Sequence, residues 1–363
     1  MNILHVLEDF SINNGGVTTV VRALHKHLLK AGLNSYILSP NCEDESENIF
    51  PIKSLKAWRL SWNFNKKLKE ICTTYNIHII HIHGVWMHPQ FQSAKYAVKN
   101  KIPFVVSAHG MYEPWLWTKG TLKKKLYVKF VVKQFFEKST SFHAITRNEV
   151  HSLKEVFGAN INTFEIPNLI EQEKLKFTSD VNHYGKYFLY LGRLHEKKGI
   201  DLLIKAFSKL KKPEIKLVIA GEFNTYKNEL DELINKEKIS EKVIFTNLVK
   251  GKTKFNLYKN ALAFVAPSHS EVIGMVNIEA AISNTPVITT YDTGIDKRWN
   301  EEGGILISLN EQNLYEALKK AAEWSDNERN SRGETLKKFV IEHYSWEKRG
   351  KDWVDNYTSI LMR

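Results

Sequence analysis

Two glutamates stand eight residues apart in the stretch SEVIGMVNIEAAISNTPVI, where Glu271 and Glu279 lie on either side of Gly274. In one continuous helix, with a rise of about 1.5 Å per residue, they would be about 12 Å apart, too far to act as a paired acid and base on one bond. We therefore expect Glu271 in a loop that follows the strand LAFVAP. The helix then begins near Gly274 and carries Glu279 in its early turns.

The start of that helix is a candidate anion site. The first backbone N–H groups of a helix have no acceptor inside it, and here Gly274, Met275 and Val276 would present them between the two carboxylates. A diphosphate on the amides, with hydroxyl-rich groups near each carboxylate, would satisfy the arrangement, and that ligand is a nucleotide sugar. The alternative is a surface glutamate followed by one that the helix dipole favours, and the spacing leaves it open.

A basic loop follows another predicted strand in the segment YLGRLHEKKG. Arg193 could bind phosphate oxygens in a fork, and Lys198 could add a point charge, so together they suit a diphosphate. The alternative is a solvated basic run. Lys197 or His195 in the same segment could be the residue that binds the diphosphate in place of Lys198.

Two features of the first half could also contact a ligand. The run VVSAHG ends a predicted strand with His109, although a lone histidine is more often structural. Gly15 and Gly16 open the first predicted helix, followed by Val17, and the missing side chains would let the backbone approach a ligand. The spacing is not G-x-G-x-x-G, so the nicotinamide-binding fingerprint is absent.

Strand-length apolar runs alternate with amphipathic segments and must position these residues. NILHVL, SYILSP, IHIIHIHG and PFVVSAHG mark the first half, and the pattern restarts with YFLYLG, KLVIAG, KVIFTN and LAFVAPS. This alternation is typical of βαβ units and parallel sheets, which bind ligands outside the carboxyl ends of their strands. The sequence predicts an α/β protein with two Rossmann-like, doubly wound domains facing across a cleft.

The composition limits the partners and the compartment. A formal net charge of +12 over 363 residues favours acidic partners, whether nucleic acid, anionic lipid or phosphorylated small molecules. Two cysteines are too few for a disulfide framework, and the start MNILHVLEDF lacks the features of a signal peptide. We expect a cytoplasmic protein whose contact with a membrane, where one exists, is peripheral.

The motifs together resemble those of retaining glycosyltransferases of family four, which have the GT-B fold. The resemblance rests on E-x7-E followed by a small-residue helix and PVI, and on G-R-L followed by a lysine before glycine. It implies that Glu271 contacts the donor sugar and Glu279 the ribose. It also implies that Arg193 and Lys198 bind the donor diphosphate. His109 would bind the donor sugar near its anomeric carbon.

The same resemblance implies a division of labour along the chain. Residues 1–175 would form an acceptor-binding domain, and residues 176–344 a donor-binding domain. A last helix, residues 345–363, would return to the first domain, and its amphipathic pattern predicts inward-facing Trp346, Trp353, Val354, Tyr357 and Leu361. In the first domain, the backbone of Gly16 and Val17 would contact the donor.

A rival reading comes from HIHIHGVWMH, in which His81 and His83 alternate onto one strand face as metal-binding histidines do. A third ligand and a bridging carboxylate have no evident place in the sequence. The chain also contains no D-x-D triplet. We therefore expect no metal and no cofactor, with cations and amides stabilising the leaving diphosphate.

The segment of residues 109–139 mixes aromatic and basic side chains and resembles a subgroup that builds bacterial surface polysaccharide and lipopolysaccharide, with acceptors that are often lipid-linked. Such a helix could rest on an anionic membrane, and it could equally pack an apolar face on the sheet. The residues concerned are Trp115, Trp117, Tyr127, Phe130, Phe135, Phe136, Lys119, Lys123, Lys124, Lys125, Lys129 and Lys133.

The resulting hypothesis is a metal-independent, retaining glycosyltransferase. It would move a sugar from a UDP- or GDP-sugar to a hydroxyl of a glycan or lipid-linked acceptor, at or near the inner face of the cytoplasmic membrane. A nucleotide-sugar epimerase of the same fold is the alternative. A nucleic-acid-binding protein is suggested by charge alone, and no recognition module supports it. Two departures from the family pattern, Asn247 and the loop with Gly294, put base and sugar contacts in doubt.

Overall fold

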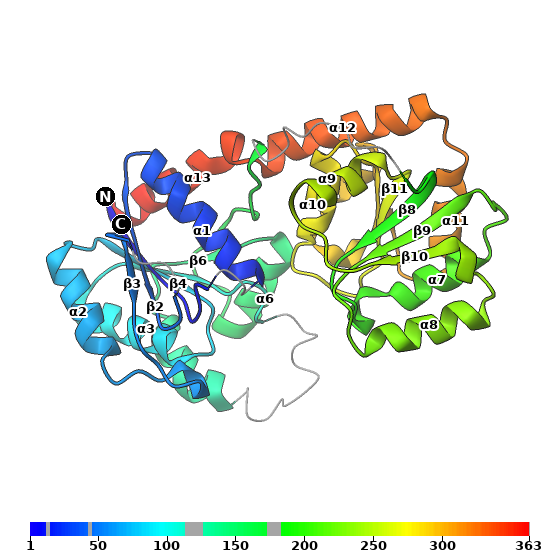
Figure 1. Cartoon of the computed structure of the whole chain (residues 1–363). Coiled ribbons are helices and arrows are strands. Elements are labelled where there is room, and N and C mark those ends of the chain that lie inside the picture. The colour runs from blue at the N-terminus through cyan, green and yellow to red at the C-terminus, as the bar shows by residue number, and fades with distance from the viewer. Residues whose placement is uncertain (12–14, 43–45, 113–125, 173–182, 363) are drawn as a thin grey trace. The chain divides into compact units, whose positions relative to one another are not determined.

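We describe the protein from a computed structural model, in which residues 1–11, 15–42, 46–112, 126–172 and 183–362 are described. Contacts between Cα atoms divide the chain into two compact units. Unit 1 comprises Met1–Leu169 and Arg349–Arg363, and unit 2 comprises Ile170–Lys348. Figure 1 labels the elements of both units.

Unit 1 is built on a parallel sheet. The described part of the unit holds seven strands in the order β3-β2-β1-β4-β5-β6-β7. The central strands β4, β5 and β6 are buried along their whole length, as in parallel sheets that helices cover on both faces. The strands are β1 Asn2–Val6, β2 Asn34–Ser39, β3 Ile49–Pro51, β4 Ile79–His83, β5 Phe104–Ser107, β6 Ser141–Ala144 and β7 Thr163–Glu165.

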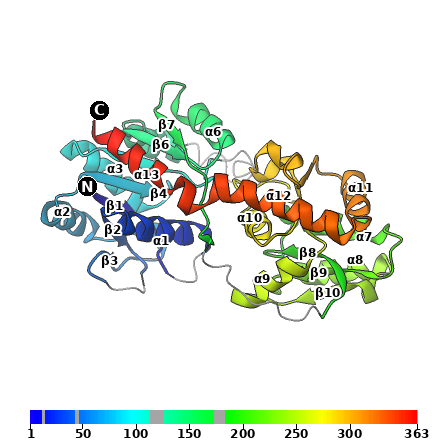
Figure 2. The ribbon, with the colours of Figure 1, turned by 90° about the horizontal axis from the view of Figure 1, so that it is seen from above.

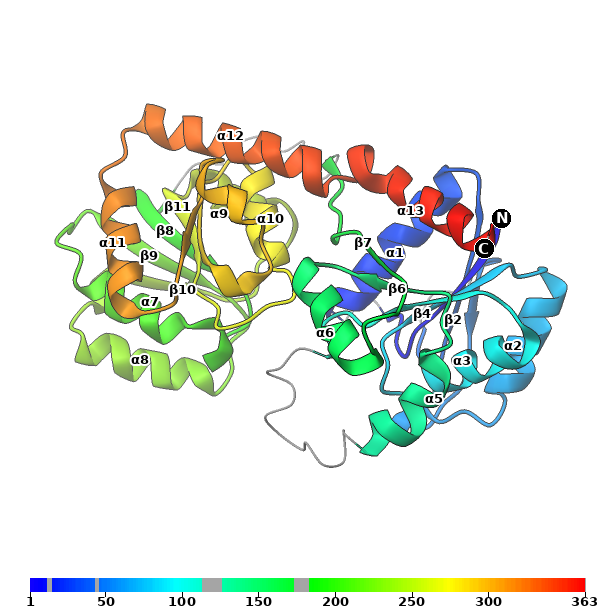
Figure 3. The ribbon, with the colours of Figure 1, turned by 180° about the vertical axis from the view of Figure 1, so that it is seen from behind.

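Helices cover both faces of this sheet. Figure 3 shows α2, α3 and α5 on one side and α1 and α13 on the other. A π-helical turn, Val128–Val132, leads into α5, and a 3-10 turn, Ala57–Arg59, precedes α2. The helices are α1 Gly15–Lys30, α2 Phe64–Thr74, α3 His88–Asn100, α5 Lys133–Phe136, α6 Arg147–Phe157 and α13 Trp346–Leu361.

The apolar spacing of the sequence explains how α1 and α13 dock. In α1, Val21 and Leu24 are buried, as a 3.6-residue period requires of one face. In α13, Trp353 and Tyr357 are buried, but Leu361 is exposed, so the inward position predicted for Leu361 is wrong. The reason is that Ile360 takes the buried position in the last turn. Figure 2 shows α1 and α13 over the β1 and β4 side of the sheet.

Unit 2 repeats the same architecture with a smaller sheet. Its described residues form six parallel strands in the order β10-β9-β8-β11-β12-β13. The strands are β8 Lys186–Leu191, β9 Ile215–Ala220, β10 Val243–Thr246, β11 Ala263–Ala266, β12 Val287–Thr290 and β13 Ile305–Ile307.

The helices of unit 2 also form two layers, with α7, α8 and α11 on one face of the sheet and α9, α10 and α12 on the other (Figure 1). Apolar side chains of α7, α8 and α11 form one core with those of the strands. The helices are α7 Ile200–Ser208, α8 Tyr226–Lys236, α9 Gly251–Asn260, α10 Met275–Ile282, α11 Glu311–Ala322 and α12 Asp326–Tyr344. Short 3-10 turns occur at Glu196–Lys198, Ser240–Lys242, Tyr291–Thr293 and Lys297–Asn300.

The basic and aromatic segment is only partly visible. Trp115, Trp117, Lys119 and Lys123–Lys125 lie outside the described residues. In the remainder, Val132 and Phe136 are buried, whereas Lys129 and Phe130 are exposed. The segment therefore has both a packed apolar face and an exposed aromatic side chain. Across the described chain, no helix has the length and apolar character needed to cross a membrane.

Candidate active site

The loop that carries Glu271 is fixed by hydrogen bonds to a neighbouring loop of unit 2. The amide of Glu271 donates to the carbonyl of Asp292 over 2.8 Å, and that of Gly274 donates to the carbonyl of Thr293 over 3.0 Å. The helix α10 then begins at Met275. Glu271 thus lies in a loop after β11 and Glu279 inside a helix, as the spacing predicts.

The departure from the family pattern at Gly294 has a structural role. Gly294 has φ +68°, and a Cβ built there would lie 1.7 Å from the carbonyl oxygen of Val272. Only glycine combines that backbone conformation with such a close approach. The loop with Gly294 therefore packs directly against the backbone of the Glu271 loop at Val272.

The prediction that the amide of Gly274 is free is wrong. Gly274 is the N-cap of α10, so its amide still belongs to the loop, where Thr293 takes its hydrogen bond. The amides of Met275 and Val276 remain in the first turn of the helix, where no intrahelical acceptor exists. Among the described residues neither donates to a backbone carbonyl outside the helix. The candidate anion site therefore has two amides rather than three.

Lys198 and Glu271, which the sequence assigns to different parts of a ligand, form an ion pair. Their side chains are 17% and 20% exposed, so the pair is largely shielded from water. Gly199 makes this possible, because it has φ +65° and a Cβ there would lie 2.2 Å from the carbonyl oxygen of Pro267. The basic turn is thereby pressed against the chain that leads from β11 to Glu271.

Glu279 has a second lysine as its partner. The Nζ atom of Lys254 lies 2.8 Å from Glu279 Oε1, and the hydroxyl of Tyr258 donates to Glu279 Oε2 over 3.2 Å. Lys254 and Tyr258 are one turn apart on α9 and therefore share a face. Burial, followed by the charge of Glu279, raises the pKa of Tyr258 well above its usual value, which keeps the hydroxyl a donor. Sequence reasoning missed both residues.

Arg193 is exposed at the end of β8. Its backbone carbonyl accepts a hydrogen bond from the hydroxyl of Tyr190 over 2.9 Å, which fixes the loop. Its guanidinium, by contrast, forms no ion pair or hydrogen bond with any residue the structure describes. Of the two predicted cations, Lys198 is thus paired and Arg193 is available.

The candidate residue of unit 1, His109, lies just past β5 in a strained turn. It has φ +52°, which is uncommon for a residue with a Cβ, and Gly110 follows with φ +76°. The buried carboxylate of Glu149 holds this turn. It accepts hydrogen bonds from the amide of Gly110 over 2.6 Å and from that of Ile145 over 2.7 Å. Glu149 is a third residue that sequence reasoning missed.

The ring of His109 contacts His83, which in turn contacts His5. His109 Nε2 lies 3.0 Å from His83 Nδ1, and His83 Nε2 lies 3.0 Å from His5 Nδ1. Burial, with a smaller effect of the charge on His143, lowers the pKa of His109 to about 3. Burial also lowers the pKa of His5 to about 3 and that of His83 well below its usual value. These rings are neutral at physiological pH.

The glycine-rich start of α1 is only partly described, because residues 12–14 lie outside the described chain. Gly16 is exposed and Val17 is half-buried. Asp9 anchors the preceding loop: its backbone carbonyl accepts from the hydroxyl of Thr18 over 2.8 Å, and its side chain pairs with Arg59 at 2.7 Å. The start of α1 is therefore tied to the end of β1.

Three histidines of unit 1 come close enough to share a metal ion, since ring nitrogens of His5, His81 and His83 lie within 4.8 Å of one another. The sequence indicated His81 and His83 and offered no third ligand. Strand pairing supplies His5, which lies opposite His81. Both nitrogens of His81 are hydrogen-bonded, to Tyr357 and Ser107 at 2.6 Å each. A metal ion would have to displace these bonds.

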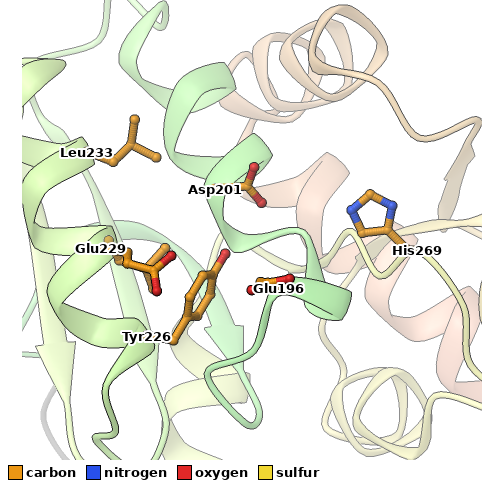
Figure 4. Close-up of a pocket in the computed structure, with 7 residues that line it drawn as sticks. Glu196, Asp201, Tyr226, Glu229, Leu233 and His269 are labelled. Atoms are coloured by element: carbon orange, nitrogen blue, oxygen red, sulfur yellow. The ribbon is translucent and has the colours of Figure 1, made fainter. Parts of the chain in front are cut away.

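A pocket of about 360 Å³ opens on unit 2, and Figure 4 shows Glu196, Asp201, Tyr226, Glu229 and His269 around it. It contains none of the predicted donor-binding residues. Burial, with the charges of the three carboxylates, raises the pKa of Tyr226 to about 12. Because its lining is acidic, the pocket is unsuited to a diphosphate.

Comparison with known proteins identifies the family. The model for "Glycosyltransferase Family 4" matches residues 14–174, and that for "Glycosyl transferases group 1" matches residues 171–339. The alpha-monoglucosyldiacylglycerol synthase of Streptococcus pneumoniae is 30% identical over 307 residues, which cover 75% of this chain and 67% of that protein. The chain is a family 4 glycosyltransferase.

Solved structures agree with this assignment at the level of the fold. Sucrose-phosphate synthase from Thermosynechococcus elongatus superposes with a TM-score of 0.81 at 18% identity, covering 99% of each chain. Anabaena Alr3699/HepE, determined in complex with UDP-glucose, superposes with a TM-score of 0.77 at 14% identity, covering 99% of this chain and 100% of the other. The glycosyltransferase therefore has the predicted GT-B fold. The epimerase alternative is not favoured.

Proposed function

We propose that this glycosyltransferase moves a sugar, with retention of its anomeric configuration, from a UDP- or GDP-sugar to a hydroxyl of a glycan or lipid-linked acceptor. The observation that carries the proposal is the group of charged side chains around the start of α10 in unit 2. There two lysine–glutamate pairs, Lys198 with Glu271 and Lys254 with Glu279, flank the first turn of α10. Cations, carboxylates and helix-start amides in one place match a ligand with a diphosphate and hydroxyl-rich ends.

The leaving diphosphate is held by Arg193, Lys198 and the amides of Met275 and Val276 in this proposal. An ammonium group has three N–H donors, and Glu271 needs only one of those of Lys198. Lys198 can therefore bind phosphate oxygens while it orients Glu271. Contacts of this kind act strongly on charge that develops as the bond to the sugar breaks.

The carboxylates orient the hydroxyl-rich parts of the donor. Glu271 accepts from hydroxyls of the sugar, and Glu279, held by Lys254 and Tyr258, accepts from the ribose. His109 contacts the donor sugar, and Gly16 and Val17 add backbone contacts, as the family resemblance implies. None of these groups needs a metal ion or a cofactor.

The reaction proceeds on one face of the sugar. The acceptor oxygen bonds to the anomeric carbon as the bond to the phosphate oxygen breaks, and the acceptor proton passes to that departing oxygen. We assign no carboxylate as a covalent nucleophile. Retention then follows from attack on the face that the leaving group vacates.

The acceptor is a lipid-linked molecule or a glycan of the cell surface, including lipopolysaccharide. Two observations support a lipid. The name of the Streptococcus pneumoniae relative describes a glucosylated diacylglycerol as its product. In addition, Phe130 is 64% exposed next to exposed Lys129, a combination that suits an anionic membrane surface. The enzyme would work in the cytoplasm, at the inner face of the membrane.

Kinetics of alanine variants test the proposal. Glu271→Ala, Arg193→Ala and Lys198→Ala should each lower kcat at least tenfold, about 1.4 kcal/mol of barrier. Lys197→Ala, in the same turn as Lys198, is the matched control and should retain activity. The donor is identified first, by measuring which UDP- or GDP-sugar raises the melting temperature. Wild-type rates in all three variants would refute the assignment.

A further inference from the structure

The polar interior of unit 1 contains two hydrogen-bonded chains of histidines, and only one of them reaches His109. The first runs from Tyr357 through His81 and Ser107 to His143. The second joins His5, His83 and His109. Because a neutral imidazole has one donor and one acceptor nitrogen, each chain has a definite direction.

The direction of the first chain follows from its end. His143 Nε2 lies 2.8 Å from the carbonyl oxygen of Ile166, which can only accept, so Nε2 carries the hydrogen. Burial lowers the pKa of His143 to about 4, so the ring is neutral and its Nδ1 accepts from the Ser107 hydroxyl over 2.7 Å. Ser107 must then accept from His81 Nε2, and the Tyr357 hydroxyl donates to His81 Nδ1. Every polar atom between Tyr357 and Ile166 is satisfied.

The direction of the second chain follows from its buried end. His5 Nε2 is buried and has no hydrogen-bond partner among the residues that the structure describes. If His109 donated to His83 and His83 to His5, that nitrogen would be a buried N–H without an acceptor. In the reverse direction it is a buried lone pair, and unpaired buried N–H groups are the rarer of the two. His5 Nδ1 therefore donates to His83 Nε2, and His83 Nδ1 donates to His109 Nε2.

This direction fixes what His109 offers to a ligand. With Nε2 accepting from His83, the single ring hydrogen of His109 resides on Nδ1. The ring then presents an N–H donor, which suits an oxygen atom of a sugar and cannot remove a proton from it. The turn around His109 is held separately by Glu149 through the amide of Gly110.

We propose that His83 and His5 are positioning residues that hold His109 as its Nδ1–H tautomer, so that the ring donates a hydrogen bond to the donor sugar. This rests on the contact between His109 and the donor sugar proposed above. Neither His83 nor His5 needs to touch the ligand. Their effect passes through the orientation and the tautomer of one ring.

The direct test is a long-range ¹H–¹⁵N correlation spectrum of the full chain labelled with ¹⁵N-histidine. Comparison with the spectrum of His109→Gln assigns the signals of His109. The proposal predicts a protonated Nδ1 and an unprotonated Nε2. A protonated Nε2, or a doubly protonated ring at neutral pH, would overturn it without any measurement of activity.

Substitutions at His83 supply the kinetic test. His83→Leu removes both ring contacts, and we expect kcat to fall about tenfold, as substitutions of partners that orient an active-site group commonly do. His83→Asn places an amide nitrogen near the position of Nδ1, which can still donate to His109, and should recover most of that loss. A loss of equal size in both variants would contradict the proposal. Melting temperatures of both establish that they fold.

A control from the first chain separates positioning from general damage to the core. Ser107→Ala breaks two buried hydrogen bonds beside the same sheet, but none to His109, and should leave kcat and the His109 signals unchanged. A fall in kcat for Ser107→Ala as large as that for His83→Leu would refute the assignment. His109→Gln distinguishes the two proposals. If it is active, the role of His109 itself is wrong, whereas if it is inactive and His83→Leu is active, only the positioning claim fails.

Discussion

The two units hold their candidate residues in opposite ways. In unit 2 the groups are charged, lie in the loops after β8 and β11 and on α9 and α10, and meet as lysine–glutamate pairs that are about one-fifth exposed, at 17% to 22%. In unit 1 they are uncharged histidines, and His5, His83 and His143 are at most 2% exposed. A site for a diphosphate needs charge that can exchange partners. A site that presents one neutral ring needs a dry, fixed surrounding.

The comparison predicts that acid destabilises unit 1 first. Its buried histidines have pKa values of about 3 for His5 and about 4 for His143, against 6.5 in the unfolded chain. Between these values the unfolded state binds more protons than the folded state. The free energy of unfolding therefore has its full value above pH 6.5 and decreases as the pH falls below it. By pH 5, each of these two histidines lowers the free energy of unfolding by about 2 kcal/mol.

Chemical denaturation between pH 7.5 and 5 measures this slope. His143→Gln should reduce it, because one titrating group is removed. His151, whose side chain is 78% exposed, provides the control, and His151→Asn should leave the slope unchanged. A stability that did not change over this range would contradict the neutral interior of unit 1.

Gly294→Ala should displace the loop that carries Glu271 in unit 2. The new Cβ would meet the carbonyl oxygen of Val272 at 1.7 Å in a backbone conformation with φ +68°, so we expect a loss of about 3 kcal/mol and reduced donor binding. Gly185→Ala is the matched control, because Gly185 has φ +71° and a Cβ built there would meet no described atom within 4 Å beyond its chain neighbours. It should cost about 1 kcal/mol. Equal melting temperatures for the two variants would show that the close approach is unimportant.

Lys254→Met tests whether the second ion pair of unit 2 belongs to the donor site. Without its partner at 2.8 Å, Glu279 loses its orientation, and we expect the KM for the donor to rise about tenfold with a smaller change in kcat. Lys252→Met, on the exposed part of the same helix, should leave KM unchanged. An unaltered KM for Lys254→Met would limit the donor site to Glu271 and its neighbours.

Tyr258→Phe should give the smallest change. Its hydroxyl donates to Glu279 over 3.2 Å, a long hydrogen bond, and the ion pair with Lys254 remains. We expect KM to rise about threefold or less, about 0.7 kcal/mol. A larger effect than that of Lys254→Met would mean that the hydroxyl, and not the ammonium, orients Glu279.

The sequence predicts the elements of this enzyme better than the contacts between them. Apolar runs and turn residues place Glu271 in a loop and Glu279 in a helix, because both depend on local periodicity. Lys254 was missed because nothing local indicates that α9 faces α10. His5 was missed for the same reason, since it lies opposite His81 only when β1 pairs with β4.

The hydrogen bonding of individual groups was also beyond the sequence. The amide of Gly274 was expected to be free, and the carbonyl of Thr293, from another loop, occupies it. Lys198 and Glu271 were assigned to different parts of a donor, and the structure pairs them with each other. The first fact depends on the approach of the loop after β12, which Gly294 permits, and the second on the approach of the basic turn to Pro267, which Gly199 permits.

A crystal structure of the enzyme with its UDP- or GDP-sugar tests the central claim most directly. We predict that the diphosphate lies on the amides of Met275 and Val276, within hydrogen-bond distance of the Arg193 guanidinium and of Lys198 Nζ, while Lys198 keeps its contact with Glu271. A diphosphate bound away from the first turn of α10, with Arg193 and Lys198 making no contact to it, would contradict the account.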